Sequence, residues 1–202
     1  MTRLTRRFEA ALAYATQVHH GQVRKKTRIP YVSHLLGVAA LVLEDGGSGD
    51  EAIAALLHDA CEDQPLGSGR NARQRRLDEI HRLYGARVTR IVAGCTETLR
   101  VRKPSWGARK RAYLKRLTQE TDAGILRVSL ADKLHNARAI LSDYRQLGER
   151  LWDRFNAGKE DQLWYYRSLV DAFSKNPHTT RGRMVGELQR VVSELDRLAL
   201  PT

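Results

Sequence analysis

The chain has 202 residues, of which 42% are hydrophobic, so it is long enough to bury one substantial core, and we expect a single domain over residues 1–202. No apolar run of membrane-spanning length occurs, and the N-terminus is basic and then amphipathic, which argues against a membrane span and a secretory leader and predicts a cytoplasmic protein. The formal net charge of +12 fits a polyanionic partner, whether nucleic acid, a membrane surface or a phosphorylated metabolite, and it also fits an arginine-rich solvated surface. Nucleic acid is the less favoured partner, because no glycine–aromatic signature lies between the arginines.

Apolar residues recur at helical spacing along the whole chain, and no segment alternates as a strand would. The first predicted helix covers 4–20, and the second begins after Pro30 and ends at the glycines of 46–49. Asp50 is the predicted N-cap of a third helix that runs to Pro65. Further helices are predicted at 77–85, 85–97, 107–120, 122–147, 159–175 and 181–199. The predicted fold class is all-α.

The third predicted helix ends in a cluster of ionisable side chains. Its apolar segment stops at Leu57 and is followed by His58, Asp59, Glu62 and Asp63. On a continuous helix, His58 and Glu62 would share a face, with Asp59 at its edge. Because ionised groups next to an apolar run are costly to bury unless they are paired or bound to a metal, this segment predicts a metal site.

Two other segments supply groups of the same chemistry. His34 lies among apolar residues of the second helix, and Asp132 ends an apolar run, with Asn136 one turn further on. His34 alone also fits a satisfied core histidine, but with His58, Asp59 and Asp132 it forms a mixed nitrogen–oxygen set. Such a set suits one first-row divalent ion, and Mn²⁺ is our first choice because hard oxygen ligands are present and thiolates are not.

The remaining carboxylates of the cluster fit a second task. Glu62 and Asp63 follow the predicted ligands by one turn, so they are placed to orient a metal-bound water or to accept its proton. The sequence therefore predicts a division of labour between metal ligands and water-activating carboxylates.

These residues lie in segments that resemble the motifs of HD-domain metal-dependent phosphohydrolases, whose H…HD…D pattern is matched by His34, His58–Asp59 and Asp132. The resemblance is closer to one branch, the RelA/SpoT-type hydrolase domains and the stand-alone small alarmone hydrolases of the Mesh type. Further segments resemble its H-x-G-Q-x-R-K motif at 20–25, P-Y-I-x-H at 30–34, A-A-L-L-H-D-x-x-E-D at 54–63, F-G-x-x-V at 84–88, V-x-x-V-T-D/E at 92–97 and L-A-D-K/R-L-x-N at 130–136. The ordered match spans about residues 8–170.

The resemblance implies a bundle of about ten helices that binds one Mn²⁺ ion and removes the 3′-pyrophosphate from guanosine 3′-pyrophosphate alarmones. It implies that Asn136 holds the ribose and that Arg24 and Lys25 flank the purine, where a guanidinium can stack on a base. Tyr165 would line the nucleotide pocket, although core packing explains it equally well. The synthetase domain of the larger alarmone enzymes is not expected in this chain, which predicts a hydrolase only.

The chain also departs from the family pattern. The loop before Tyr31 is one residue longer than usual, Leu35 replaces a proline, and Ala139 stands where a polar residue can contact the nucleotide. These departures leave the purine open, so adenosine alarmones stay candidate substrates. A nucleotidase acting at the 5′ phosphate and a non-catalytic nucleotide sensor are the alternative functions, and the oligomeric state stays open.

Overall fold

The computed structural model describes residues 2–69, 71–97, 104–179 and 182–199, and the regular elements of these ranges are helices. In chain order they are α1 (Arg6–Val18), α2 (Val32–Glu44), α3 (Gly49–Leu57), α4 (Ala60–Asp63), α5 (Ala72–Cys95), α6 (Trp106–Gln119), α7 (Ala123–Leu147), η1 (Gly148–Arg154), α8 (Lys159–Lys175) and α9 (Arg183–Ala199). The predicted all-α class is confirmed. Because α4 has only four residues and η1 is a 3₁₀ helix, the predicted number of about ten full helices is corrected to eight within the described ranges.

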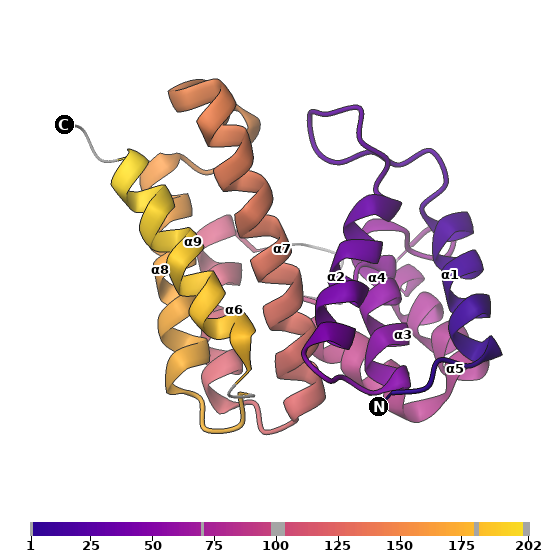
Figure 1. The fold of residues 1–202 in the computed structure, drawn as a ribbon. Coiled ribbons are helices and arrows are strands. Elements are labelled where there is room, and N and C mark those ends of the chain that lie inside the picture. The colour runs from indigo at the N-terminus through magenta and orange to yellow at the C-terminus, as the bar shows by residue number, and fades with distance from the viewer. Residues whose placement is uncertain (1, 70, 98–103, 180–181, 200–202) are drawn as a thin grey trace.

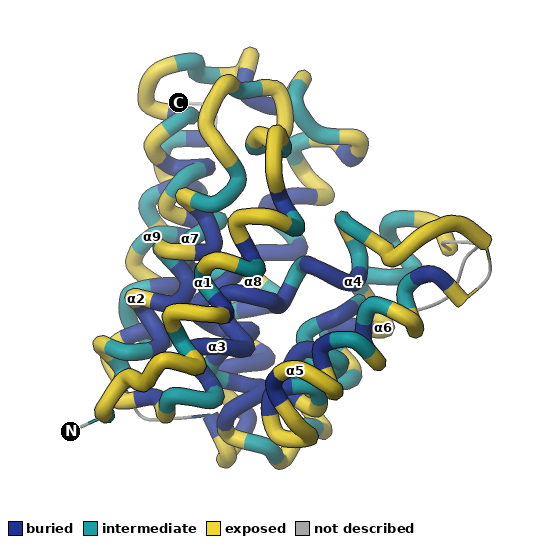
Figure 2. Tube along the Cα trace, turned by 90° about the vertical axis from the view of Figure 1, so that its right-hand side faces the viewer, coloured by how far each residue is buried: buried dark blue, intermediate teal, exposed yellow. Residues whose placement is uncertain are grey.

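Helix α7 lies in the middle of the fold, between α1–α5 on one side and α6, α8 and α9 on the other (Figure 1). It packs against α2, α3 and α5, and also against α8, α9 and η1. The buried, dark blue parts of the chain in Figure 2 concentrate where these helices meet. One hydrophobic cluster joins both sides, from Ala11 in α1 to Ala199 in α9. A side chain in the middle of α7 can therefore meet side chains from either group of helices.

Helix α3 begins two residues earlier than predicted, because Ser48 and not Asp50 is its N-cap. The Ser48 hydroxyl accepts a hydrogen bond from the backbone N–H of Glu51, and the Glu51 carboxylate accepts one from the backbone N–H of Ser48, which forms a capping box. Asp50 instead forms an ion pair with Arg7, at 2.9 Å between Nη1 and Oδ1. The cap fixes the start of the helix that leads to His58.

The prediction of one continuous helix from Asp50 to Pro65 is wrong. Helix α3 ends at Leu57, His58 and Asp59 form a turn, and α4 starts at Ala60. The backbone of Asp59 has φ −96° and ψ −5°, at the edge of the helical region. Neighbouring side chains on a regular helix diverge by about 100°. The turn removes that constraint, so the side chains of both residues can be directed at one point.

Gly85, predicted as the end of one helix and the start of the next, lies inside α5 as a kink. Its backbone has φ 82° and ψ 176°, a conformation that residues with a Cβ rarely adopt. Helical residues continue on both sides of it, and the first part of α5 begins at Ala72, five residues before the predicted start at 77. The two predicted helices therefore exist, joined at the glycine without a loop.

Asp122 ties the start of α7 to α5. Its Oδ1 accepts hydrogen bonds from the backbone N–H groups of Gly124 and Ile125, at 2.9 and 3.4 Å, and its carboxylate is also paired with the Arg87 guanidinium. The hydrogen bond from Arg87 is the main reason that the pKa of Asp122 lies below its usual range. The carboxylate therefore contributes stability in its ionised form.

We predict that Asp122→Ala lowers the free energy of unfolding at neutral pH by about 1–2 kcal/mol, because a helix cap and an ion pair are lost. The contribution is present above about pH 4, where an unfolded aspartate is ionised, and is lost as the pH falls through the lower pKa of the folded state. Urea unfolding at a series of pH values should show the gap between wild type and variant closing in acid. Asp171→Ala, which removes an exposed i,i+4 pair with Lys175, is the control and should cost less than about 0.5 kcal/mol. A gap that does not change with pH would contradict the assignment.

Candidate functional site

The four predicted metal ligands lie together where α2, the turn between α3 and α4, and α7 meet. Ligand atoms of His34, His58 and Asp59 all lie within 4.8 Å of one another. Asp132 joins them from α7, with its Oδ1 at 3.2 Å from Nε2 of His34 and 3.6 Å from Nε2 of His58. Residues from three separate segments thus present two imidazoles and two carboxylates to one point.

His58 is held so that one ring nitrogen faces this point. Its Nδ1 lies 2.8 Å from the backbone carbonyl oxygen of Ala55, to which it donates a hydrogen bond. Its Nε2 is buried and forms no hydrogen bond with any described residue, although it lies 2.9 Å from Oδ2 of Asp59. Burial alone would lower the pKa of His58, but the carboxylates of Asp59 and Asp132 hold it well above its usual range. Carboxylates that favour a positive charge on this imidazole would equally favour a divalent cation in place of its Nε2 proton.

The two carboxylates are oriented by neighbouring donors. Both oxygens of the buried Asp132 accept hydrogen bonds, Oδ1 from the Asn136 amide at 2.6 Å and Oδ2 from the Lys133 ammonium at 2.5 Å. Burial opposes ionisation, but Lys133 and the two histidines hold the pKa of Asp132 well below its usual range. Asp59 Oδ2 accepts a hydrogen bond from the Tyr31 hydroxyl at 2.5 Å. Both carboxylates are therefore held in the ionised form that a metal ligand needs, and the complete donor set suits a first-row divalent ion.

Glu62 and Asp63 lie in α4, directly after the turn. Asp63 Oδ2 accepts a hydrogen bond from Gln22 Nε2 at 2.9 Å. Gln22 is itself fixed, because its Oε1 lies 2.7 Å from His19 Nδ1 and accepts a hydrogen bond from Gln64 Nε2, also at 2.7 Å. Partial withdrawal from water and the nearby Asp59 carboxylate raise the pKa of Asp63. The sequence did not single out Gln22, although it stands in a segment quoted for its family resemblance.

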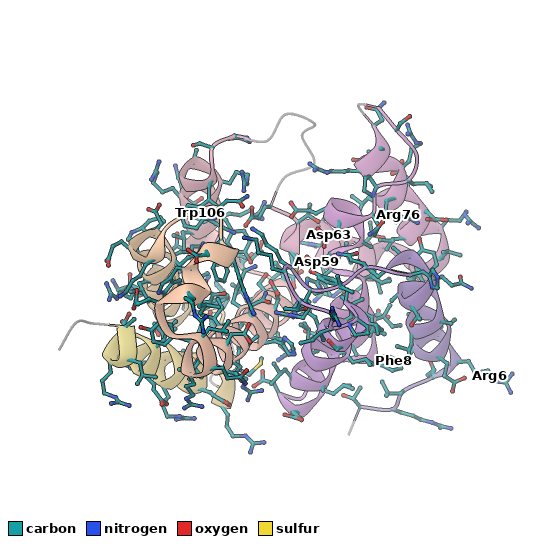
Figure 3. All side chains as sticks on the ribbon, turned by 90° about the horizontal axis from the view of Figure 1, so that it is seen from above. Arg6, Phe8, Asp59, Asp63, Arg76 and Trp106 are labelled. Atoms are coloured by element: carbon teal, nitrogen blue, oxygen red, sulfur yellow. The ribbon has the colours of Figure 1, made fainter. Side chains whose placement is uncertain are left out.

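A cavity of about 610 Å³ lies between the N-terminal helices and the α6–α8 group. The four ligand-type residues are not part of its lining, but their hydrogen-bond partners Tyr31, Lys133 and Asn136 are. Figure 3 shows Asp59 and Asp63 on the inner side of the N-terminal helices, with Trp106 across from them; Asp63 and Trp106 both line the cavity. Its walls carry five cations and two carboxylates: Arg24, Lys25, Lys110, Lys133, Arg154, Asp63 and Asp143. The cavity is therefore suited to an anionic ligand. Lys133 and Asn136 line it and also hydrogen-bond to Asp132, so they connect the cavity to the cluster.

All four predicted substrate-binding residues line this cavity: Arg24, Lys25, Asn136 and Tyr165. Arg24 donates from Nη2 to Asn136 Oδ1 at 2.9 Å, while its Nη1 makes no hydrogen bond with any described residue. Lys25 donates to Asn156 Oδ1 at 3.0 Å. The four residues come from α7, α8 and the loop before α2, and the cavity is the place where these parts of the chain meet.

The longer loop before Tyr31 does not remove Arg24 from the cavity. An isolated bridge pairs Val23 with Pro30, and the backbone N–H of Arg24 donates to the carbonyl of Ile29 at 2.9 Å. The tip is a tight turn in which Lys26 has φ 54°, an uncommon value for a residue other than glycine. The bridge closes the loop on the side of Arg24 that leads to the helices, and Arg24 still reaches Asn136.

Lys110 and Trp106 are lining residues that the sequence did not indicate. Both lie on α6, where Lys110 pairs with Glu97 and its Nζ lies 4.5 Å from the ring centroid of Tyr165, within cation–π range. Burial lowers the pKa of Lys110. Neither residue belongs to a motif that the sequence displays, and only their helical spacing on α6 relates them to each other. Their role at the cavity could be found only from the fold.

The Tyr165 hydroxyl allows a test of whether this wall of the cavity keeps a polar group available for a ligand. Its hydroxyl is buried and has no hydrogen-bond partner among the described residues, whereas the Tyr144 hydroxyl donates to Glu149 at 2.6 Å. We predict that Tyr165→Phe leaves the ligand-free stability unchanged or raises it, because no hydrogen bond is lost, and that Tyr144→Phe costs about 0.5–1.5 kcal/mol. Urea unfolding of both variants measures this. A larger loss for Tyr165→Phe than for Tyr144→Phe would contradict the picture.

Comparisons with known proteins relate this chain to one family. The HD domain family matches residues 11–162. Guanosine-3′,5′-bis(diphosphate) 3′-pyrophosphohydrolase MESH1 of Homo sapiens is 34% identical over 133 residues, which cover 64% of this chain and 67% of the human protein. A GTP pyrophosphokinase of Streptomyces coelicolor is 30% identical over 139 residues, which cover 69% of this chain. The chain spans only 15% of that enzyme and 16–17% of two 3′-pyrophosphohydrolases from Aquifex aeolicus and Spiroplasma citri.

Solved structures agree on the fold. A metazoan ortholog of SpoT that hydrolyzes ppGpp superposes with a TM-score of 0.74 at 22% identity, over 99% of this chain and 100% of that one. A protein of Listeria monocytogenes superposes with a TM-score of 0.68 at 23% identity, over 81% of this chain and 99% of that one. Among the helices that the structure describes, none is long and apolar enough to span a membrane.

Proposed function

Because the chain belongs to the HD-domain family, and its relatives place it with the RelA/SpoT-type hydrolases, we propose that it is a metal-dependent hydrolase of (p)ppGpp-type alarmones. It would remove the 3′-pyrophosphate and leave the nucleotide with its 5′ phosphates. The observation that carries the proposal is a cluster of two imidazoles and two carboxylates whose hydrogen-bond partners Tyr31, Lys133 and Asn136 line a cationic cavity of about 610 Å³, a size suited to a nucleotide.

His34, His58, Asp59 and Asp132 would hold one ion, for which we propose Mn²⁺ because two of the four ligands are hard carboxylate oxygens. When bound, such an ion polarises a phosphoryl oxygen and lowers the pKa of a water. Lys133 and Asn136 would keep both oxygens of Asp132 in place, and Tyr31 would do the same for Asp59. These donors support the assignment, because ligand carboxylates are commonly fixed by hydrogen bonds from a surrounding layer of residues.

Glu62 and Asp63 would orient the attacking water and accept its proton. The hydrogen bond from Gln22 limits the orientations available to Asp63, and the raised pKa of Asp63 makes it a better proton acceptor near neutral pH. Glu62, half-buried one turn after His58, would take the complementary position at the water. The hydrolytic proton would therefore leave on the side of the site formed by α4.

The far part of the cavity would bind the nucleoside and its 5′ phosphates. We assign Asn136 to the ribose and Arg24 and Lys25 to the base, with Tyr165 on the wall behind them. Arg24 has an unused N–H group and a planar guanidinium, which suits stacking on a purine. Ala139 also lines the cavity and offers the base no hydrogen bond from its side chain, so adenosine alarmones are included as candidate substrates.

Product analysis tests the proposed reaction. Purified protein with Mn²⁺ is expected to release pyrophosphate from guanosine 3′-pyrophosphates and to leave the 5′ phosphates intact, as measured by anion-exchange chromatography. The adenosine analogues should be assayed in parallel to establish the base preference. Release of phosphate from the 5′ side would support the alternative nucleotidase, and tight binding of the nucleotide without turnover would support the alternative sensor. Either outcome would overturn the proposal.

A pair of variants separates metal binding from proton transfer. Asp59→Ala removes a ligand and is expected to lose both Mn²⁺ binding and hydrolysis. Glu62→Gln keeps the ligands and is expected to bind Mn²⁺ normally while kcat falls by about 10²–10⁴-fold. Isothermal titration with Mn²⁺ and steady-state kinetics measure the two properties. Wild-type turnover in Asp59→Ala, or a normal kcat in Glu62→Gln, would refute the corresponding role.

A further inference from the structure

The two histidines of the proposed metal site are held in different ways. His58 donates from Nδ1 to a backbone carbonyl, as described above. Nδ1 of His34 instead faces Nδ1 of His135 on α7, at 3.0 Å. Nε2 of His34 is the nitrogen that faces the carboxylates, at 3.2 Å from Asp132 and 3.6 Å from Asp59. The Nδ1 side of the His34 ring, which faces away from the cluster, therefore contacts another side chain and not a backbone carbonyl.

A cation at Nε2 of His34 would fix the protons of this pair. If Nε2 of His34 presents its lone pair to a cation, its hydrogen is on Nδ1, and only a lone pair on Nδ1 of His135 can accept it. The proton of His135 is then on its own Nε2. The ring centroids lie 4.8 Å apart with 60° between the planes, so the contact runs through the ring edges. In that arrangement His135 is a hydrogen-bond acceptor, and it faces His34 and not the cluster.

Gly37 provides the space that this contact needs. It lies on α2, one turn after His34, and a Cβ at this position would lie 2.3 Å from both Cδ2 and Nε2 of the His135 ring. Real Cβ atoms essentially never approach other atoms so closely. Any larger residue at 37 would push the ring of His135 away. Gly37 has a helical backbone conformation, so the property that matters here is its lack of a side chain.

We propose that His135 is a positioning residue that orients the metal ligand His34, and that the absence of a side chain at Gly37 leaves room for the His135 ring. This inference rests on the metal ligands assigned in the proposed function. Partners that hold a ligating histidine typically change metal affinity by about 10–100-fold when removed. His135 should act on affinity for the ion in the same way, without being a ligand itself.

Mn²⁺ affinity, measured by isothermal titration and by the electron paramagnetic resonance signal of free Mn²⁺, tests the inference without requiring turnover. His135→Phe keeps a ring but loses the acceptor, and should weaken Mn²⁺ binding by about 10–100-fold. His135→Asn places an acceptor oxygen near the former Nδ1 position and should restore most of the affinity. Circular dichroism and thermal unfolding without metal confirm that each variant is folded.

Gly37→Ala provides the second arm. It should weaken Mn²⁺ binding in the wild-type background, where the new methyl group displaces His135, but not in a His135→Ala background, where no ring is present to displace. Because alanine favours helix over glycine, adding Gly37→Ala to the His135→Ala variant should not lower its metal-free stability.

The outcomes separate this inference from the proposed function. If wild type binds Mn²⁺ and the His135→Phe variant binds it equally well, or if Gly37→Ala weakens binding by the same factor in both backgrounds, the positioning role is overturned while the proposed function stands. If wild type binds no Mn²⁺ at all, the proposed ligand set is overturned and this inference with it.

Discussion

Asp132 carries a carboxylate into the interior of the protein, and the arrangement of the surrounding residues neutralises both of its oxygens. An ionised carboxylate is stable in such a place only with charged or hydrogen-bonding partners. Lys133 and Asn136 donate hydrogen bonds to it from its own helix, and the Nε2 atoms of His34 and His58 approach its Oδ1 from the N-terminal helices at 3.2 and 3.6 Å. Because those histidines sit on separate segments, α2 and the α3–α4 turn must both reach α7 at the same point. The junction between the two groups of helices is therefore determined by charge as well as by apolar packing.

The sequence predicted helices well wherever local pattern was enough. The segment 159–175 was predicted with the bounds that α8 has, and the predictions for α6, α7 and α9 differ by one or two residues at their starts. The family resemblance was also confirmed, because the HD domain family matches residues 11–162 and the human relative is 34% identical over 133 residues. The four predicted ligands come together, although no local pattern could place His34 next to Asp132. That step needed either the fold or the resemblance.

The failures share a physical cause. A helix from Asp50 to Pro65 agrees with the propensities of its alanines and leucines, but the turn at 58–59 allows two adjacent side chains to face the same point, and propensity carries no information about that requirement. The partners of the site were missed for a related reason. His135 and Lys110 are unremarkable in sequence, and they become significant only when α7 and α6 are placed against the other elements. Contacts of this kind depend on tertiary packing.

The positive charge also divides into two kinds once the fold is known. Arg138 and Arg145 join α7 to α9 through Glu187 and Glu194, and Arg167 joins α8 to α9 through Asp196. These exposed pairs contribute little energy each, but they use part of the arginine excess on the surface. The cations that line the cavity form a separate group, close to the cluster of ligand-type groups, where they would attract an anion toward it.

In the hairpin-like loop before α2, the length of the loop and the direction of its binding residue Arg24 are set by different parts of the chain. Val23 and Pro30 pair below the tip, so the direction in which Arg24 leaves the chain is set by the bridge, while Lys26 and its neighbours form a turn beyond it. We therefore expect a change of length at the tip to leave the reach of Arg24 to Asn136 largely unchanged. The turn at His58 and Asp59 has no such reserve, because one inserted residue there would rotate a ligand away from the cluster. Tolerance of length variation is thus unequally distributed around the site, high at its rim and absent at its base.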